Sequence, residues 1–576
     1  MQTYDLPVKL EALANGSITA ESIFSSISNE DVARLIFSRF EDDHDDTFAS
    51  GESILEGDVT GILVLSKEVA KAISASNDEN GSTGYIYSVP EGDIDDFQAI
   101  KHSIAFFTSN KGKTTFSPVQ SVSEGKPTII SVPVEYHESD EDVELTILRS
   151  DGKSWATTTK KRWITLEAAN GSHLTIAEGS PISLACGEGK VFAGNRPLRR
   201  SDIDDVYMLL AQAYAEAEKE FGPEHAWDRI SDTDYFGDIA VRLAKLTNND
   251  LFAGFQKLRD FAVERAPLDV LVNVHNTSCV VKAKLLASTV WMAGDKCEIV
   301  DNDVSYGVGL LRDERMWTDP DDIDTLRIIL LGPDCTTSER YAQALAYYKE
   351  RHGSKFYSIF CARPGDCCVI RTLCMPFSKF LPDTFDIEAF CDRQSLDVAS
   401  VSKEFSRISG EKEVYHGCRG IRLFSIRPDL MELWLRTVLS ALKKAHDAGI
   451  PTDVRFLLAT LTLPEEASIF IKALESIAAD IFGSDEAAPI AGVATMLETG
   501  GAYISLEEIL SQKGDVFQMN GGLIGSNDFT TACLNMNRGD APRYLIPGYV
   551  EKGIFPASPF KHIYAPIVGK AMQGAL

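Results

Sequence analysis

The sequence lacks the features that tie a chain to a membrane or to secretion. No run approaches the eighteen or more apolar residues that a membrane-spanning helix needs. The first residues, MQTYDLPVKLEALANG, contain no basic segment followed by an apolar core, so they do not resemble a signal peptide. Hydrophobic content of 44% and charged content of 24% are ordinary for a globular protein. We therefore expect a cytoplasmic protein with no membrane partner.

Positive charge is also scarce. The chain has 56 basic and 85 acidic residues, which gives a formal net charge of −29. Binding to nucleic acid or to an anionic membrane requires clustered Lys and Arg, so this composition predicts neither partner. A small anionic ligand remains compatible with it, but only where arginines are locally concentrated.

The paired cysteine motifs of structural zinc sites are missing as well. The eleven cysteines include a dense group at Cys361, Cys367, Cys368 and Cys374, but this spacing offers neither two C-x₂-C pairs nor paired histidines. In a long chain without a secretory signal, cysteines are typically reduced and mostly buried. The spacing therefore favours packed thiols over a thiolate metal site.

The chain is too long for a single hydrophobic core, and its pattern changes along its length. Residues 1–45 are polar with helical spacing and predict a helical linker segment. Short β-type runs fill residues 46–200, and a long amphipathic helix over 203–221 opens a helical connector at 201–264. From residue 265 to residue 576, apolar runs alternate with helical stretches, which is typical of βα units in a parallel sheet or barrel.

The runs that predict strands in this last region are LDVLVNV, YGVGLLR, LRIILLG, FYSIFCA, CCVIRTL, RGIRLFS, VRFLLATL, IAGVATMLE and FQMNGGLIG. IAGVATMLE ends in the acidic Glu498, and FQMNGGLIG is followed closely by Asn527 and Asp528. Carboxylates at the carboxyl ends of barrel strands point into the mouth, where two of them can hold a magnesium ion. The alternative is that Glu498 is a solvated loop residue and Asp528 a helix N-cap.

Several phrases of the second half resemble, in the same order, motifs of the PEP-utilising enzyme family, which includes pyruvate phosphate dikinase and phosphoenolpyruvate synthase. GVGLLRDERMW is similar to G-I-G-L-x-R-T-E-H-M-F, and CCVIRTLCMPFSKFLPD to T-I-R-x-L-D-P-P-x-x-E-F-L-P. GCRGIRL, ATMLETGGAY and GSNDFTT are similar to G-x-R-G-x-R-L, G-x-M-I-E-x-P-R-A and G-T-N-D-L-T-Q. The resemblance runs from about residue 30 to residue 576.

The resemblance implies an α/β fold in which a β-rich swivelling domain of the phosphohistidine type precedes a PEP/pyruvate-binding TIM-type barrel. It also implies the members of a ligand pocket. Three arginines would clamp the phosphate and carboxylate of phosphoenolpyruvate, one amide would donate to the substrate, and two carboxylates would hold Mg²⁺. These residues are Arg312, Arg371 and Arg419, then Asn527, then Glu498 and Asp528.

Two departures from the family pattern limit the expected chemistry. The stretch TSNKGKTTFSPVQSVSEGKP places Phe116 where the family has its phosphorylated histidine, and phenylalanine has no nitrogen to carry a phosphoryl group. Only six barrel strands can be matched, beginning with the strand of Asn273, and the family's C-G-E-H-G-G motif does not occur. Cys533 is expected to be a packed thiol rather than a replacement for that motif's acid. We expect a barrel truncated after its sixth strand, with a homodimer or a partner chain completing it.

Three functions are compatible with these observations. The chain could be an enzyme of PEP/pyruvate phosphotransferase type that runs altered chemistry without the phosphohistidine relay. It could also be a catalytically inactive pseudoenzyme with a regulatory role, or one subunit of a split dikinase. Retained arginines and carboxylates favour binding of Mg²⁺ and a PEP- or pyruvate-like anion, because a pocket under no constraint loses buried charges first. A self-sufficient dikinase is not expected.

Overall fold

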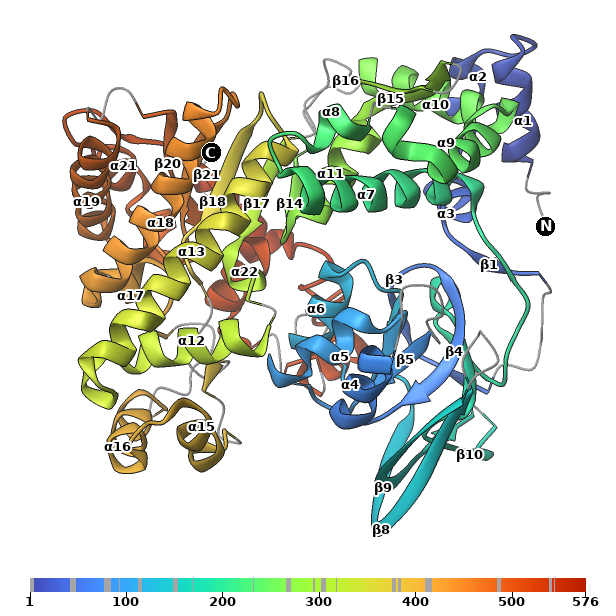
Figure 1. Cartoon of the computed structure of the whole chain (residues 1–576), viewed down its shortest axis with the longest axis horizontal. Helices are drawn as coiled ribbons and strands as arrows, with labels where there is room; N and C mark the ends of the chain where they lie inside the picture. Colours follow the sequence, from blue (N-terminus) through green and yellow to red (C-terminus); the bar gives the residue numbers. More distant parts are fainter. Residues whose placement is uncertain are drawn as a thin grey trace. The chain divides into compact units, whose positions relative to one another are not determined.

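The computed structural model of the chain describes residues 5–41, 48–76, 84–92, 94–111, 116–148, 154–168, 170–230, 233–265, 271–293, 296–301, 307–317, 319–374, 380–381, 385–409, 417–483, 488–537, 541–542 and 544–575. These residues form a mixed α/β structure that divides into two compact units (Figure 1). The first unit comprises Met1–Val206 and Asn248–Ala262, and the second comprises Tyr207–Thr247 and Val263–Leu576. Among the described helices, none is both long and apolar enough to cross a membrane.

The first unit is built on an eight-stranded mixed sheet in the order β2-β12-β11-β4-β5-β6-β7-β3. Its strands are β2 (Ala49–Ser50), β3 (Glu52–Leu55), β4 (Asp58–Val64), β5 (Tyr85–Ser88), β6 (Ala105–Phe107), β7 (Thr128–Ile130), β11 (Pro181–Ala185) and β12 (Lys190–Ala193). The strands β4 to β7 are parallel and are connected through α4 (Lys67–Ser76), α5 (Phe97–His102) and α6 (Phe116–Ser123). Apolar side chains from the sheet form two buried clusters, as expected for a sheet whose two faces are both covered.

Smaller elements complete this unit. The three-stranded antiparallel sheet consists of β8 (Val134–Leu148), β9 (Ser154–Glu167) and β10 (His173–Ala177), and the short pair of β1 (Arg39–Phe40) and β13 (Leu198–Arg199) lies apart from it. The remaining helices are α1 (Leu6–Ala14), α2 (Ala20–Phe24), α3 (Asn29–Ile36) and most of α10 (Asp250–Glu264).

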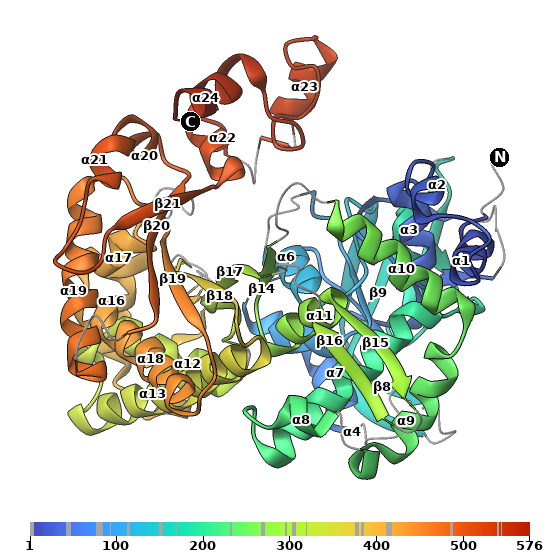
Figure 2. The same cartoon turned by 90° about the horizontal axis from the view of Figure 1, so that it is seen from above.

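The second unit contains a sheet of six parallel strands that follow one another in chain order. They are β14 (Val272–Val274), β17 (Val308–Arg312), β18 (Cys367–Arg371), β19 (Asp453–Leu458), β20 (Ile490–Leu497) and β21 (Met519–Ile524). Figure 2 shows β17 to β21 side by side, with α13 (Ser338–Ala362), α18 (Pro428–Asp447) and α19 (Pro464–Phe482) along one side of them. Six runs predicted as strands thus form strands, although the start of LDVLVNV lies outside the described residues.

Further elements precede these strands, connect them or follow them. They are α7 (Asp202–Phe221), α8 (Ala226–Ile230), α9 (Thr233–Thr247), α11 (Thr277–Ala287), the hairpin β15 (Ser288–Ala293) and β16 (Lys296–Asp301), α12 (Pro320–Leu331), α15 (Ile387–Gln394), α16 (Val398–Ser409), α17 (Ile421–Ile426), α20 (Gly500–Ile504), α21 (Leu506–Leu510), α22 (Ser526–Leu534), α23 (Leu545–Glu551) and α24 (Lys570–Ala575).

Three of the predicted strands are wrong. LRIILLG lies in α12, FYSIFCA is the end of α13, and RGIRLFS includes α17. The physical reason is that a short, continuously apolar run is also produced by a buried helix. In α12 the last ten residues, Asp322–Leu331, are all buried, so its polar residues do not define an exposed face from which a helical period could be recognised.

Alternate residues of the parallel strands point to the inner face of the sheet. One buried cluster contains Leu310 of β17, Leu457 of β19, and Ala494 and Met496 of β20, with Val369 of β18 packed against it. Since side chains alternate along a strand, the next inward positions after these residues are found by steps of two. This period determines which side chains reach the carboxyl ends of the strands on the inner face.

Candidate functional site

The period-two alternation carries three predicted residues to one edge of the sheet. Arg312 lies two residues beyond Leu310, Arg371 lies two beyond Val369, and Glu498 lies two beyond Met496. Arg312 and Arg371 are also directly opposite each other in the pairing of β17 with β18. The inner face of the sheet at the carboxyl ends of its strands therefore gathers these charges, as the resemblance implied.

Glu498 is buried, with only 3% of its surface exposed. Its Oε1 accepts a hydrogen bond of 2.7 Å from the backbone N–H of Thr460. Burial raises the pKa of Glu498, and the nearby Asp528 raises it further, while Arg419 and Arg371 oppose the increase. The alternative that Glu498 is a solvated loop residue is therefore wrong.

Asp528 lies in the first turn of α22, and the N-cap of that helix is Gly525. Its Oδ2 accepts a hydrogen bond of 3.1 Å from the guanidinium of Arg419. The expectation of Asp528 as a helix N-cap is therefore wrong, because the residue is already inside the helix. Its carboxylate instead lies close enough to Glu498 to repel it electrostatically.

Arg419 precedes α17 and is 6% exposed. Thr460 fixes its backbone, because the Thr460 hydroxyl donates to the Arg419 carbonyl at 2.8 Å. Burial by itself would lower the pKa of Arg419, but Cys374, Asp528 and Glu498 raise it, so the group stays charged. The Nε of Arg419 is buried and has no hydrogen-bond partner among the described residues.

Arg371 forms an ion pair with Glu314. Burial alone would raise the pKa of Glu314, but Arg371 and the neighbouring Arg315 and Arg312 hold it below its ordinary value. In the described part of the chain, the Nε of Arg371 is also buried without a hydrogen-bond partner. Each of these two arginines is thus held by a carboxylate through one nitrogen, while its Nε–H is buried without a hydrogen-bond partner among the described residues.

The two remaining predicted residues are less tightly placed. Arg312 is half-buried at the end of β17, beside Arg371. Asn527 is exposed in the first turn of α22, and within the described residues no hydrogen bond links its side chain to the cluster. The structure therefore brings together Arg312, Arg371, Arg419, Glu498 and Asp528, but it does not draw Asn527 into the same group.

Sequence reasoning missed several charged or polar residues of this edge. His275 follows β14 and is 7% exposed. Arg315 lies beside Glu314, and burial followed by Arg312 and Arg371 lowers the pKa of Arg315 to about 10. Cys374 belongs to the inner cluster. The available signal is positional, since His275 and Cys374 follow directly on predicted strands and Arg315 lies three residues beyond one, but the sequence does not show which of them point inward.

Glu498 and Asp528 are the residues that could hold a metal ion. No group of three or more His, Cys, Asp and Glu side chains is gathered for a metal in the described part of the chain. Mg²⁺ usually takes one or two protein carboxylates and completes its octahedral shell with water and ligand oxygens. Two mutually repelling carboxylates fit this preference, because a cation between them relieves the repulsion that raises the pKa of Glu498.

Two further predictions concern residues outside this cluster. Phe116 begins α6 in the first unit, but its side chain and residues 112–115 lie outside the described part of the chain. Cys533 lies on α22 and packs into a small apolar cluster with Phe529 and Val568, and burial raises the pKa of its thiol. The expectation that Cys533 is a packed thiol is confirmed.

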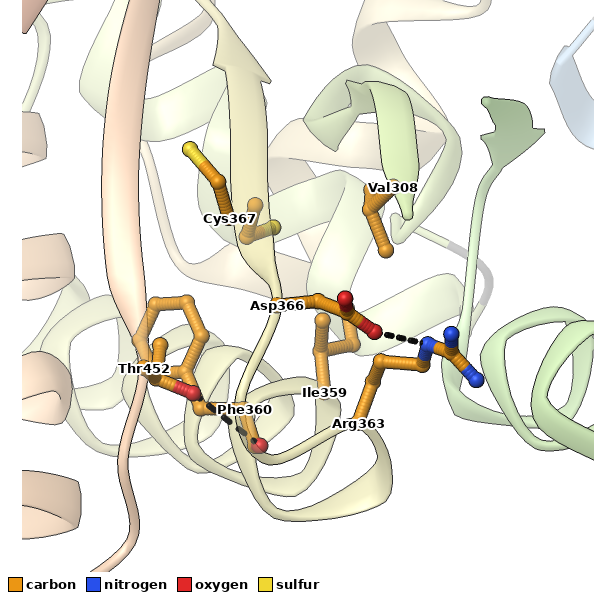
Figure 3. Close-up of a pocket in the computed structure, with 8 residues that line it drawn as sticks. Val308, Ile359, Phe360, Arg363, Asp366, Cys367 and Thr452 are labelled. Carbon is orange, nitrogen blue, oxygen red and sulfur yellow. Dashed lines mark hydrogen bonds and ion pairs between the residues drawn. The ribbon is translucent and has the colours of Figure 1, made fainter. Parts of the chain in front are cut away.

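A small pocket lies at the opposite, amino-terminal end of the strands (Figure 3). It is lined by Val308 and Cys367, the first residues of β17 and β18, together with Phe360 and other residues. The Thr452 hydroxyl donates to the Phe360 carbonyl at 3.5 Å, and Arg363 pairs with a neighbouring aspartate. In α/β barrels the amino-terminal end supports stability, whereas ligands bind at the carboxyl end. The candidate site is therefore the charged edge and not this pocket.

Comparison with known proteins identifies the class of the second unit. Residues 275–555 match the family model described as "PEP-utilising enzyme, PEP-binding domain". Pyruvate, phosphate dikinases from Mesembryanthemum crystallinum (chloroplastic) and Giardia intestinalis are 29% and 27% identical over 276 residues, which are 47% of this chain. The chain spans only 28% and 29% of the length of these relatives.

Residues 275–555 are thus similar to the PEP-binding domain of PEP-utilising enzymes, and the six parallel strands fit the TIM-type barrel expected of that domain. A solved structure described as a putative mandelate racemase/muconate lactonizing enzyme from Sorangium cellulosum was also found, at 12% identity over 67% of this chain and 88% of that one. Its TM-score of 0.14 supports no conclusion about the fold.

Proposed function

We propose that this chain is a degenerate relative of pyruvate phosphate dikinase that binds Mg²⁺ together with a phosphoenolpyruvate- or pyruvate-like anion. The observation that carries the proposal is the convergence of the largely buried Arg371 and the buried Arg419 with Glu498 and Asp528 at one strand edge. A buried guanidinium N–H without a partner is costly, and an anionic ligand would satisfy it. The family match over residues 275–555 agrees with this ligand class.

Each residue has a distinct role in the proposed pocket. Arg371 and Arg419, joined by Arg312, bind phosphate and carboxylate oxygens, for which planar guanidinium groups are suited. Glu314 and Asp528 hold the Arg371 and Arg419 forks in orientation before the ligand arrives. Asn527 would donate to the ligand only after its exposed side chain turns toward the cluster.

Glu498 and Asp528 would hold Mg²⁺, which when bound supplies positive charge to an enolate oxygen. The buried position of Glu498 and Arg419 keeps water away from these charges and so strengthens their interactions with a ligand. Phe116 offers no nitrogen for a phosphoryl group, so the chemistry that we propose does not pass through a phosphohistidine.

Calorimetric titration with phosphoenolpyruvate in the presence of Mg²⁺ tests the binding. Wild-type protein should give saturable heat, and Glu498→Ala should weaken binding at least about tenfold, because about 1.4 kcal/mol or more of interaction is lost. The matched control is Glu507→Ala, an exposed glutamate on α21, which should bind as wild type does. Absence of heat, or heat that Glu498→Ala leaves unchanged, contradicts the pocket.

A second measurement separates an enzyme from a binding protein. The ³¹P spectrum of phosphoenolpyruvate is followed with Mg²⁺, the protein and a mixture of cell metabolites. Conversion that depends on Glu498 supports a phosphotransferase or enolate-chemistry enzyme. Unchanged phosphoenolpyruvate in protein that binds it favours the pseudoenzyme alternative.

A further inference from the structure

His275 occupies the inner edge of the proposed pocket on its β14 side. Asn273 of β14 pairs with Leu310 of β17, so His275, two residues further along, falls beside Arg312 on the same face. Its imidazole is 7% exposed, and among the described residues its buried Nδ1 has no hydrogen-bond partner. A buried ring nitrogen without a partner is unusual and destabilising, which points to a ligand that completes it.

The charged groups that face His275 are mostly cations. They are Arg312 of β17, Glu314 and Arg315 of the turn Asp313–Arg315, and Arg371 of β18. Burial, followed by Arg312 and Arg315, lowers the pKa of His275 to about 3, and Glu314 opposes this. The imidazole is therefore neutral at physiological pH when no ligand is bound.

We propose that His275 contacts the anion bound in this pocket and takes up a proton when that anion binds. The inference rests on the proposed anion site and adds a residue and a regulation by pH to it. A bound anion offsets the positive field of Arg312, Arg315 and Arg371, so the charged imidazole becomes favourable. The proton comes from solvent and no covalent bond of the ligand changes. The imidazolium then gives the ligand a charged N–H donor.

The proposal fixes the direction of the pH dependence. Because a proton is taken up with the ligand, linkage requires that anion affinity increases as pH falls through the His275 pKa of the complex. The dependence is limited to about tenfold per pH unit for one linked proton, and it disappears when His275 is replaced by a residue that does not titrate. A purely structural histidine would leave the pH profile unchanged.

Sulfate is the probe of choice, because it is a tetrahedral dianion that does not titrate near neutral pH. Calorimetry of the full-length chain between about pH 8 and about pH 5.5, in buffers of different ionisation enthalpy, gives both the affinity and the number of protons taken up. We expect wild-type affinity to rise about fivefold or more across this range with uptake of protons. His275→Gln should show a flat affinity profile over the same pH range.

Two further variants isolate the effect. His446→Gln removes a histidine of α18 whose side chain is 58% exposed, and it should follow wild type. Glu498→Gln removes a buried carboxyl of the same pocket, whose pKa is raised by burial and by Asp528, and it should keep the slope that depends on His275. Where His275→Gln does not fold, His275→Asn takes its place.

The imidazole itself gives a second readout. The ¹H–¹³C signal that is missing in the His275 variant should stay at its neutral position without sulfate and move toward the imidazolium position with it. An unmoved signal, or a wild-type pH profile in His275→Gln, overturns the role of His275 while leaving the pocket intact. Absence of sulfate binding in wild type at every pH overturns the anion pocket itself and this inference with it.

Discussion

At the scale of single residues, the site contains two buried carboxylates in opposite electrostatic environments. Arg371, Arg315 and Arg312 hold the pKa of Glu314 below its ordinary value although burial alone would raise it. Burial and the neighbouring Asp528 raise the pKa of Glu498. Pairs of titratable groups whose pKa values are shifted in opposite directions are concentrated at functional sites. Glu314 thus pairs with Arg371, whereas Glu498 is one of the two carboxylates that we propose for Mg²⁺.

Glu498→Gln should stabilise the protein in the absence of metal. Because its folded pKa is raised above the ordinary 4.5 of a glutamate, ionisation of Glu498 destabilises the native state as pH rises through that interval. The amide oxygen can still accept the Thr460 N–H. Denaturant unfolding at neutral pH should give a free energy of unfolding higher by about 1 kcal/mol, and the difference should vanish near pH 4.

Glu314→Gln is the matched contrast and should have the opposite effect. Because the pKa of Glu314 is lowered in the folded protein, its ionised form stabilises the fold at pH values above the ordinary pKa of a glutamate. This stability is lost as pH falls through the folded pKa. Removing this charge leaves the largely buried Arg371 without its counterion, which is expected to destabilise by about 3 kcal/mol. Equal shifts in both variants would contradict the assignment of different roles to the two carboxylates.

At the scale of elements, the junction of β21 and α22 sets the position of Glu498. A Cβ added to Gly525 would lie 2.8 Å from the Cβ and 3.2 Å from the Oε2 of Glu498. Gly525→Ala should therefore displace this carboxylate and weaken binding of Mg²⁺ and phosphoenolpyruvate by about tenfold, or ~1.4 kcal/mol. Calorimetry gives the affinity. Gly521→Ala on the same strand is the control, because a Cβ there meets nothing within 4 Å.

The elements also show how far the sequence determines the site. Glu498 is predictable because it follows an apolar run that forms β20, whereas Arg371, the last residue of β18, is indicated only by the family resemblance. FYSIFCA was misread because it belongs to the 25-residue α13, whose buried end has no polar face to reveal a helical period. His275 follows a strand of only three residues, and its inward direction depends on the pairing of Asn273 with Leu310, which periodicity does not encode.

At the scale of the whole molecule, the formal net charge of −29 means that any affinity for an anion must be local. The second unit, which contains the candidate site, is discontinuous in sequence. It includes Tyr207–Thr247, whereas residues 248–262 belong to the first unit. The early segment is fixed by Trp227, whose indole N–H donates to the Ala362 carbonyl at 3.1 Å. The ring centroid also lies 4.3 Å from the Lys284 ammonium, and the ring packs at a tilt against the ring of Tyr214.

Trp227→Ala should therefore lower stability without altering the site. The ring contacts α7, α11 and the end of α13, whereas the anion pocket is built from strand ends. We expect the free energy of unfolding to fall by about 2 kcal/mol, less than the ~3–5 kcal/mol of a fully buried tryptophan because Trp227 is only half-buried. Sulfate and phosphoenolpyruvate affinities, measured by calorimetry well below the unfolding transition, should stay within about twofold of wild type.

Trp291→Ala, at a site 39% exposed on β15, should change neither quantity. Loss of ligand affinity in Trp227→Ala would mean that the segment Tyr207–Thr247 shapes the pocket as well as supporting the fold.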